Sequence, residues 1–190
     1  EGYQAMVLKE EQIKERVTSP IGSSRIRKAA EGCGSAAILF DDLTRPTPTY
    51  RIVPTVLEEL KKAEVPQDSI RFIMGQGAHR ASTRDDFVKK LGEEIVNNYP
   101  VFSHNPFHNC SRIGTTSFGT PVEVNSDVLN AEYILGIGGI VPHPQMGFGG
   151  GGKIILPGVS SLESIRKNHY LSVDPSGEKR PGSDWGKYKS

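Results

Sequence analysis

The strongest constraint on the fold is a repeated pattern in which a short, continuous apolar run is followed by a segment with helical spacing. Residues 36–40, residues 69–74 and Tyr133–Ile137 are three such runs. Apolar runs of this length without alternation are typical of strands buried on both faces of a parallel sheet. Residues 49–63 and residues 83–98 carry apolar side chains at helical spacing, and Thr83 suits a helix N-cap. The alternation predicts an α/β fold, a doubly wound, mostly parallel Rossmann-like sheet with helices on both faces.

Shorter elements are expected between and after these runs. They are a strand over residues 120–124, a short helix that starts at residues 125–126, a strand over residues 153–156, and a last helix from Ser160 or Ser161 to His169. A strand over residues 153–156 would place the ammonium of Lys153 at a strand edge. Residues 1–20 are rich in charge and predict a solvated helix or arm, whereas the polar residues 174–190 indicate a loop or an exposed end.

Length and composition limit the classes of protein to which the chain can belong. Its 190 residues suffice for one α/β domain, so we assign residues 1–190 to a single domain. The net charge of +1 favours neither nucleic acid nor an anionic membrane as a partner. No run reaches the roughly 18 apolar residues that a spanning helix needs. Cys33 and Cys110 lack metal-binding spacing and indicate reduced thiols in a cytoplasmic protein.

Glycine is concentrated in one stretch, which predicts a loop whose backbone comes close to a ligand. Many of the 21 glycines fall within residues 136–152. Residues 147–153 nearly match the phosphate-binding pattern GxxxxGK[ST], but Ile154 stands where a hydroxyl would hold Mg²⁺. This mismatch argues against a P-loop phosphotransferase and leaves a phosphate-bearing cofactor open, with a non-catalytic nucleotide- or phosphate-binding module as an alternative function. The candidate cofactor-binding glycines are Gly150, Gly151 and Gly152.

Further polar candidates follow the first strand and begin the last apolar run. In doubly wound sheets the ligand site lies beyond the carboxyl ends of the strands, and Asp42, Thr44 and Arg45 stand at such a place. They can be ordinary turn residues before Pro46. They can equally present a carboxylate, a hydroxyl and a guanidinium to a cleft, where an arginine suits a phosphate or a carboxylate. Lys153, beside the glycine loop, is a candidate nucleophile if its pKa is lowered.

Histidines supply the candidates for proton transfer and metal binding. His79 follows a Gly-Gln-Gly turn, and His143 is held between two prolines, so each is either a structural loop residue or a general acid and base. His104 and His108 have the spacing of a metal pair on a helix, but the proline between them argues against a helix. His169 lies late in a predicted helix, where the helix dipole favours a surface histidine.

Taken together, these motifs resemble the nickel-dependent lactate racemase family, and the resemblance covers nearly the whole chain. It is carried by the segments at residues 42–46 (Asp-Leu-Thr-Arg-Pro), 77–80 (Gly-Ala-His-Arg), 114–122 and 143–158. Lys153 follows His143 by ten residues and precedes His169 by sixteen. Each segment by itself is a weak signal, whereas the ordered set is specific.

The resemblance implies a racemase or epimerase that interconverts the enantiomers or epimers of a lactate-like 2-hydroxyacid. Members of the family use a nickel-pincer nucleotide, pyridinium-3-thioamide-5-thiocarboxylic acid mononucleotide with nickel, which exchanges hydride with the substrate Cα. By this resemblance, Lys153 tethers the cofactor covalently and His169 ligates nickel, a metal that imidazole suits. His79 and His143 exchange the substrate proton on the two faces of the reacting carbon.

The resemblance also implies the remaining site residues and the partners. Asp42, Thr44 and Arg45 match cofactor-site positions, and Asp42 and Arg45 are also needed for catalysis. Family members are about twice as long as this chain, because a second domain closes over the cofactor and binds substrate. We therefore expect an N-terminal catalytic domain, a fragment that lacks the second domain and that starts without Met, with residues missing upstream. The expected partners are a small-molecule 2-hydroxyacid and the cofactor-assembly enzymes.

Overall fold

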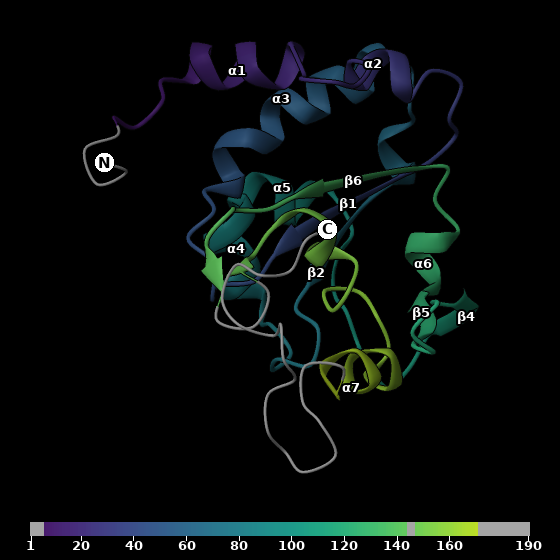
Figure 1. Ribbon diagram of the computed structural model, residues 1–190. Coiled ribbons are helices and arrows are strands. Elements are labelled where there is room, and N and C mark those ends of the chain that lie inside the picture. Colours follow the sequence, from purple (N-terminus) through teal and green to yellow (C-terminus); the bar gives the residue numbers. More distant parts are fainter. Residues whose placement is uncertain (1–5, 144–146, 171–190) are drawn as a thin grey trace.

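The computed structural model describes residues 6–143 and 147–170, and its centre is a parallel sheet of four strands (Figure 1). In the sheet order β3-β2-β1-β6, the strands are β3 Val101–Ser103, β2 Ile70–Gly75, β1 Ala36–Asp41 and β6 Tyr133–Ile137. Ile38 of β1 lies opposite Phe72 on one side and Leu135 on the other. Every residue of β1 is buried, which explains its almost continuous apolar run. The three main strands predicted from the sequence are confirmed.

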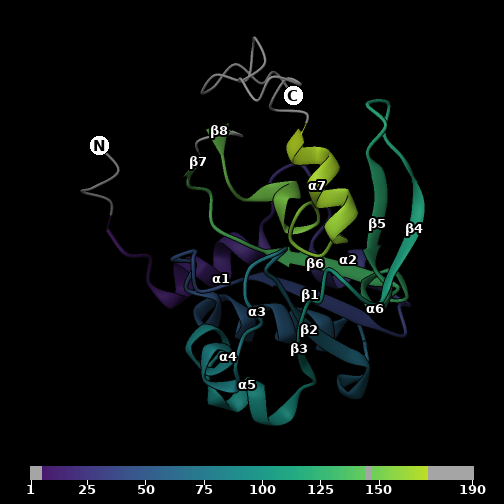
Figure 2. The ribbon, with the colours of Figure 1, turned by 90° about the horizontal axis from the view of Figure 1, so that it is seen from below.

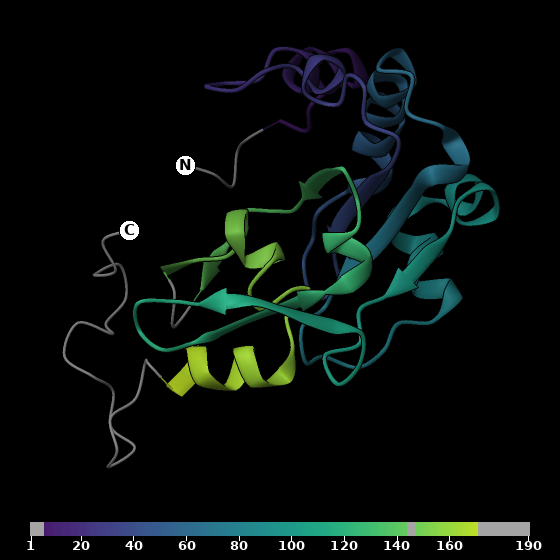
Figure 3. The same ribbon diagram turned by 90° about the vertical axis from the view of Figure 1, so that its right-hand side faces the viewer.

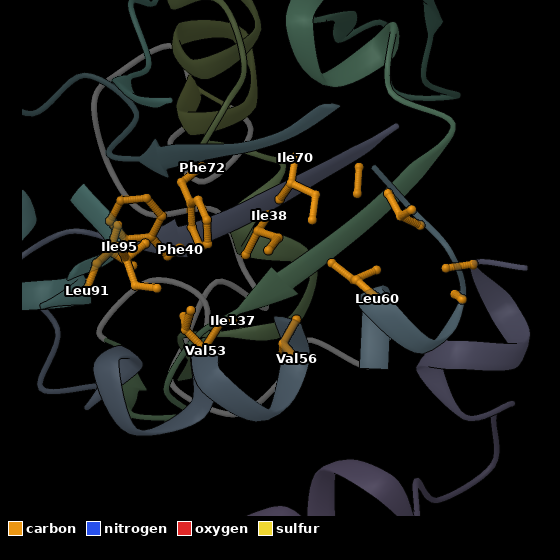
Figure 4. Close-up of a cluster of buried hydrophobic side chains, with 14 of the residues drawn as sticks. Ile38, Phe40, Val53, Val56, Leu60, Ile70, Phe72, Leu91, Ile95 and Ile137 are labelled. Atoms are coloured by element: carbon orange, nitrogen blue, oxygen red, sulfur yellow. The ribbon is translucent and has the colours of Figure 1, made fainter. Parts of the chain in front are cut away.

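Three helices cover one face of the sheet. They are α3 Thr49–Lys62, α4 Arg84–Leu91 and α5 Glu93–Asn98. The core beneath them is aromatic at one end: the ring of Phe40 lies edge-on to Phe72 and to Phe87, with centroids 6.4 and 6.5 Å apart (Figure 4). Val53 and Leu60 of α3 are completely buried in the same cluster. This packing fixes the strand ends that the site uses.

The other face is covered by shorter segments. Leu39 and Ile73 of the sheet pack there against Val124, Val128 and Val159. The segments are the hairpin of β4 Cys110–Thr115 and β5 Pro121–Asn125, α6 Ser126–Leu129, the 3-10 helix η3 Gly151–Ile154 and α7 Leu162–Tyr170. Figure 2 shows α7 and the hairpin on the side of the sheet opposite α3, α4 and α5, and in Figure 3 the hairpin runs beside α7. The predicted mostly parallel α/β sheet is confirmed, with short helical segments and a hairpin forming its second cover.

Two N-terminal helices form an outer layer on α3. Helix α1 (Glu10–Thr18) lies within the region predicted as a solvated helix or arm, and α2 is Ile26–Ala29 (Figure 1). The guanidinium of Arg25 donates to both carboxylate oxygens of Glu59, at 2.5 and 2.8 Å. This two-pronged pair lowers the pKa of Glu59 despite its burial and fixes α2 on α3.

The order of the strands creates a switch point between β1 and β6. The chain runs from β1 through α3 to β2, and through α4 and α5 to β3, always outward on one face. It then returns across the opposite face, through the hairpin and α6, and places β6 on the free side of β1. Because the two crossings lie on opposite faces, the loops after β1 and β6 separate and leave a crevice at the carboxyl ends of the strands.

Several helix starts agree with the sequence patterns. Thr83 caps α4, since its hydroxyl accepts from the backbone of Asp86 while the Asp86 carboxylate accepts from the backbone of Thr83. Ser161 accepts from the backbone N–H of Ser164 at the start of α7. Asn125 caps α6. Helix α3 starts at Thr49, the first residue of the predicted helical segment, and contains Pro54.

The structure corrects two expected elements. Residues 153–156 do not form a strand, because Lys153 N–H donates to the Gly150 carbonyl and Ile155 N–H to the Gly152 carbonyl, which closes local turns. Residues 83–98 form two helices rather than one, since Gly92 adopts a φ of 87° between α4 and α5. The 3-10 turn η2 Gln67–Ser69 and the short pair β7 Pro142–His143 and β8 Gly147–Phe148 complete the described elements. The loop expected at residues 174–190 lies outside the described residues.

Candidate functional site

A cleft of about 770 Å³ opens at the switch point, a volume that suits a nucleotide-sized ligand. Its walls are the loops that follow β1, β2 and β6, together with η3 and the end of α7. All of the candidate site residues from the sequence line it. They are Asp42, Thr44, Arg45, His79, His143, Gly150, Gly151, Gly152, Lys153 and His169. Residues that are 127 positions apart in the chain therefore meet in one place, and their individual roles remain predictions.

One wall of the cleft carries a carboxylate–imidazole pair. The Asp42 carboxylate lies 2.5 Å from Nδ1 of His79 and also accepts hydrogen bonds from the hydroxyl and the backbone N–H of Thr44. Burial by itself raises the pKa of Asp42, but the hydrogen bonds from Thr44 and then from His79 outweigh it, so the net pKa lies below the ordinary 3.8. An ionised Asp42 favours a proton on Nδ1 of His79, and this places the basic lone pair of the neutral ring on Nε2.

Another part of the cleft lining carries an amine beside a second imidazole. Nζ of Lys153 lies 3.5 Å from Nε2 of His143. Burial lowers the pKa of Lys153, and the positive charge of Arg45 lowers it further. Burial also lowers the pKa of His143, and the charges of Lys153, Arg45 and His169 act in the same direction. Both groups therefore keep a nucleophilic or basic nitrogen at a lower pH than exposed side chains of their type.

His169 reaches the cleft from the last turn of α7. Its Nδ1 lies 2.7 Å from the carbonyl oxygen of Ile165, one turn earlier in the helix. A carbonyl can only accept, so Nδ1 carries the proton and Nε2 carries the lone pair of the neutral ring. Metal-binding histidines commonly hold their second ring N–H on such an acceptor. His169 is exposed on α7, as the helix dipole suggested, and it also lines the cleft, so its geometry is compatible with a ligand role.

Bare glycine backbone seats the segment that presents Lys153. A Cβ atom placed on Gly75 of β2 would lie 2.9 Å from Cδ1 of Ile154, and one on Gly136 of β6 would lie 3.0 Å from Cγ2 of the same side chain. A Cβ on Gly158 would lie 2.1 Å from the Ile154 carbonyl oxygen. The Ile154 side chain therefore fills the space that Gly75 of β2 and Gly136 of β6 leave open. This contact explains why Lys153 begins a tight turn instead of a strand.

The same geometry separates residues 147–153 from a P-loop. A P-loop connects a sheet strand to the first turn of an α-helix. Here the glycines follow the two-residue strand β8, which pairs with β7, and lead into η3. Residues 147–153 thus differ from a P-loop in backbone conformation as well as in the sequence mismatch at Ile154.

We predict that Gly136→Val destabilises the protein by about 1–3 kcal/mol, because its side chain would overlap Ile154 in a packed contact. Urea unfolding followed by circular dichroism measures the change. Gly114→Val is the matched control, since Gly114 lies in β4 and a Cβ there meets nothing within 4 Å. Equal stability of the two variants would show that Ile154 is not seated on Gly136.

Three residues that support the site were not identified from the sequence. Asp41 ends β1 and lines the cleft, Lys90 is a buried lysine of α4, and Gln76 is buried beside the cleft with its amide donating to the His104 carbonyl. Asp41 could have been suspected as the partner of Asp42. Nothing in the sequence pattern distinguishes Lys90 from its exposed neighbour Lys89.

The other histidine pair has no catalytic surroundings. His104 is 1% exposed, and its ring lies 2.9 Å from the Ser160 carbonyl oxygen and 3.2 Å from the Asn125 amide. Burial lowers its pKa. His108 is exposed. Within residues 6–143 and 147–170, no group of three or more His, Cys, Asp or Glu side chains is arranged to hold a metal by itself.

The fold and the cleft together define a doubly wound α/β domain whose ligand site lies at the switch point of the sheet. Comparison with known proteins places it more closely. The chain belongs to the family described as the lactate racemase N-terminal domain, which matches residues 1–180. This confirms the family indicated by the motifs.

Two curated relatives are lactate racemases. The protein from Lactiplantibacillus plantarum is 32% identical over 183 residues, which are 95% of this chain and 43% of the relative. The protein from Thermoanaerobacterium thermosaccharolyticum is 32% identical over 169 residues, which are 88% of this chain and 39% of the relative. The chain thus spans about two fifths of the length of the relatives that it matches.

Solved structures agree. The lactate racemase apoprotein from Thermoanaerobacterium thermosaccharolyticum is similar with a TM-score of 0.81 and 33% identity, over 90% of this chain and 42% of the solved one. A Thermotoga maritima protein gives a TM-score of 0.69 at 26% identity, over 86% of this chain and 41% of the other. In the described part of the chain, no helix is both long enough and apolar enough to cross a bilayer.

Proposed function

We propose that the chain is the cofactor-binding catalytic domain of a racemase or epimerase acting on a lactate-like 2-hydroxyacid. The observation that carries the proposal is the meeting of Lys153, His169, His79 and His143 around one cleft. A module that only bound a nucleotide would need neither a carboxylate-held imidazole nor a desolvated amine. The names of the relatives support the same reaction.

The residues present fit a nickel-pincer nucleotide. Lys153 is a half-buried amine with a lowered pKa, which suits covalent attachment through nitrogen. His169 has its Nδ1 proton held by a carbonyl, and this tautomer suits nickel ligation through Nε2. Arg45 and the backbone of Gly150–Gly152 would hold the phosphate, since guanidinium and bare backbone N–H groups both suit anions.

The remaining groups would bind substrate and move its hydroxyl proton. When bound, the nickel-pincer group would supply the hydride chemistry at the substrate Cα. His79, oriented by Asp42, would take or return the hydroxyl proton for one enantiomer, and His143 would do so for the other. If the backbone of Gly150–Gly152 holds the phosphate without Arg45, this guanidinium would instead pair with the substrate carboxylate. The interconversion of two enantiomers would need one imidazole on each face of the reacting carbon, and two imidazoles line this cleft.

The setting of the protein follows from the same proposal. Neither Cys33 nor Cys110 is in a disulfide, which supports a reducing, cytoplasmic location. The cofactor-assembly enzymes would be partners, because Lys153 must meet a preformed nucleotide. A phosphate- or nucleotide-binding module that uses residues 147–153 is the second candidate function. The glycines that line the cleft support the binding of a phosphate, which both candidate functions share.

The proposal is tested by metal content and by chirality. The full-length protein, produced with the cofactor-assembly enzymes, is expected to carry nickel and to convert one lactate enantiomer into a mixture of both, which chiral chromatography would measure. His169→Ala should lose nickel while its melting temperature stays near that of the parent. His108→Ala, which changes an exposed histidine away from the cleft, is the control and should keep both properties. Nickel retained at full occupancy in His169→Ala would contradict the ligand assignment.

A further inference from the structure

A buried lysine outside the cleft holds the loop that carries the catalytic candidates. Lys90 of α4 is 3% exposed, and its ammonium donates to the Asp41 carboxylate at 2.6 Å. The same ammonium donates to the carbonyl oxygens of Arg45 at 2.9 Å and of Thr47 at 3.3 Å. Asp41 is the last residue of β1, and Arg45 and Thr47 lie in the turn that follows it, so one cation ties that turn to the end of the strand.

Asp41 extends this network across the switch point. One carboxylate oxygen receives Lys90, while the other accepts the Thr47 hydroxyl and the backbone N–H of Gly139, the latter at 3.2 Å. Gly139 lies in the loop after β6 and, like Asp42, lines the cleft. A single carboxylate therefore joins the two loops whose separation makes the cleft.

Close backbone packing continues the connection to the glycine loop. A Cβ on Gly139 would lie 2.6 Å from the hydroxyl oxygen of Thr47, so the two segments touch without room for a side chain. A Cβ on Gly150 would lie 2.8 Å from the Gly139 carbonyl oxygen. Gly150 leads directly into η3 and Lys153. The path from Lys90 to Lys153 is thus made of hydrogen bonds and tight contacts.

We infer that Lys90 is a positioning residue of the active site, which acts through Asp41 to hold the acid–base wall with Asp42 and His79 at a set distance from the wall with Lys153. The inference rests on the proposed function for its catalytic consequence. Any buried ammonium needs acceptors for its three N–H groups, so the number of bonds alone does not distinguish positioning from stability. What indicates positioning is their place, because all three acceptors belong to the segment that presents Asp42 and Arg45.

The test compares Lys90→Met with Lys89→Met, which removes the exposed neighbour on the same helix. In the cofactor-loaded protein, Lys90→Met should lower kcat about 10²-fold with little change in KM, because small misplacement of catalytic groups has effects of this size. Imidazole ¹⁵N spectra of the same chain give a readout without catalysis. The Nδ1-protonated form of His79 should dominate in the parent and in Lys89→Met, and should give way to mixed tautomers in Lys90→Met.

The outcomes separate the two claims. Unchanged His79 spectra and kcat in a folded Lys90→Met protein would overturn the positioning role. If the parent protein racemises no 2-hydroxyacid but the His79 signals still change, the proposed function fails and the positioning of the loop stands. If Lys90→Met does not fold, Asp41→Asn decides, since it keeps the side-chain volume and weakens the same network. Mixed His79 tautomers in Asp41→Asn support the inference, and parent-like spectra overturn it.

Discussion

Replacing Lys153 with alanine is expected to abolish covalent loading of the cofactor completely. The intact-mass spectrum of the parent protein, made with the cofactor-assembly enzymes, should show an added mass that localises to Lys153 on proteolysis. Lys153→Ala should show none and should have no detectable racemase activity, because no other described lysine lines the cleft. Mass spectrometry of the two proteins, purified in the same way, makes the comparison.

Two further variants test whether loading requires the amine of Lys153 itself. One keeps the positive charge without the amine, and the other is a control for the loss of a lysine elsewhere. Lys153→Arg keeps a cation in the cleft but cannot form the same bond, so it should also stay unloaded. Lys167→Ala removes an exposed lysine of α7 and should load normally. Full loading and activity in Lys153→Ala would refute the tether, whatever the family resemblance implies.

The second large effect is expected for Asp42→Asn. The carboxylate holds the proton of His79 on Nδ1, and an amide in its place no longer stabilises that tautomer or the imidazolium that forms during proton transfer. We expect kcat to fall by about 10²–10⁴-fold, the range found when a general acid–base group is disabled. Steady-state kinetics in both directions of the reaction measures the loss. Asp68→Asn, at an exposed position at the amino end of β2 and thus at the end of the strand away from the cleft, should behave like the parent.

The lowered pKa of Asp42 adds a pH signature to the same variant. The folded-state pKa lies below the ordinary 3.8, so folding favours the ionised form. This stabilisation is fully present above the unfolded-state pKa and is lost as pH falls through the folded-state pKa. The stability gap between the parent and Asp42→Asn should therefore be constant near neutral pH and shrink in acid below about 3.8. A gap that widens in acid would have the wrong sign for an ionised Asp42.

The sheet was predictable because its signal is local. Residues 36–40 form an apolar run in β1, which is buried on both faces. Tyr133–Ile137 is also largely apolar, although it forms the edge strand β6, whose residues alternate between partly buried and exposed. Helix α4 was similarly marked, since Thr83 and Asp86 stand at cap spacing before an apolar stripe. The hairpin strand β4 was missed because five of its six residues are exposed and carry no burial pattern.

The conformation at Lys153 was not predictable from its own neighbours. The run after this lysine is as apolar as a strand, and the distinction depends on Gly75 and Gly136, two glycines of other strands that leave space for Ile154. Lys90 was missed for a related reason, because its acceptors are backbone carbonyls of a loop more than forty residues away. Such tertiary contacts leave no trace in a helical pattern.

Which residues line the cleft, in contrast, could be predicted largely from the topology of the sheet. Loops after parallel strands meet at one edge of the sheet, so polar residues placed there converge even when they are far apart in the chain. Asp42, His79 and Lys153 met this condition. For His169 the local pattern favoured a surface role, and its place in the cleft was indicated by the ordered set of motifs rather than by spacing.

The central claim is that the imidazoles handle only the hydroxyl proton, while the hydrogen on Cα would leave and return as hydride without exchanging with water. The measurement uses lactate labelled with deuterium at Cα, racemised in ordinary water by the cofactor-loaded protein and analysed by mass spectrometry of each enantiomer. The account predicts that the newly formed enantiomer retains the deuterium. Washout of the label into water, with a histidine acting on the carbon itself, would contradict it.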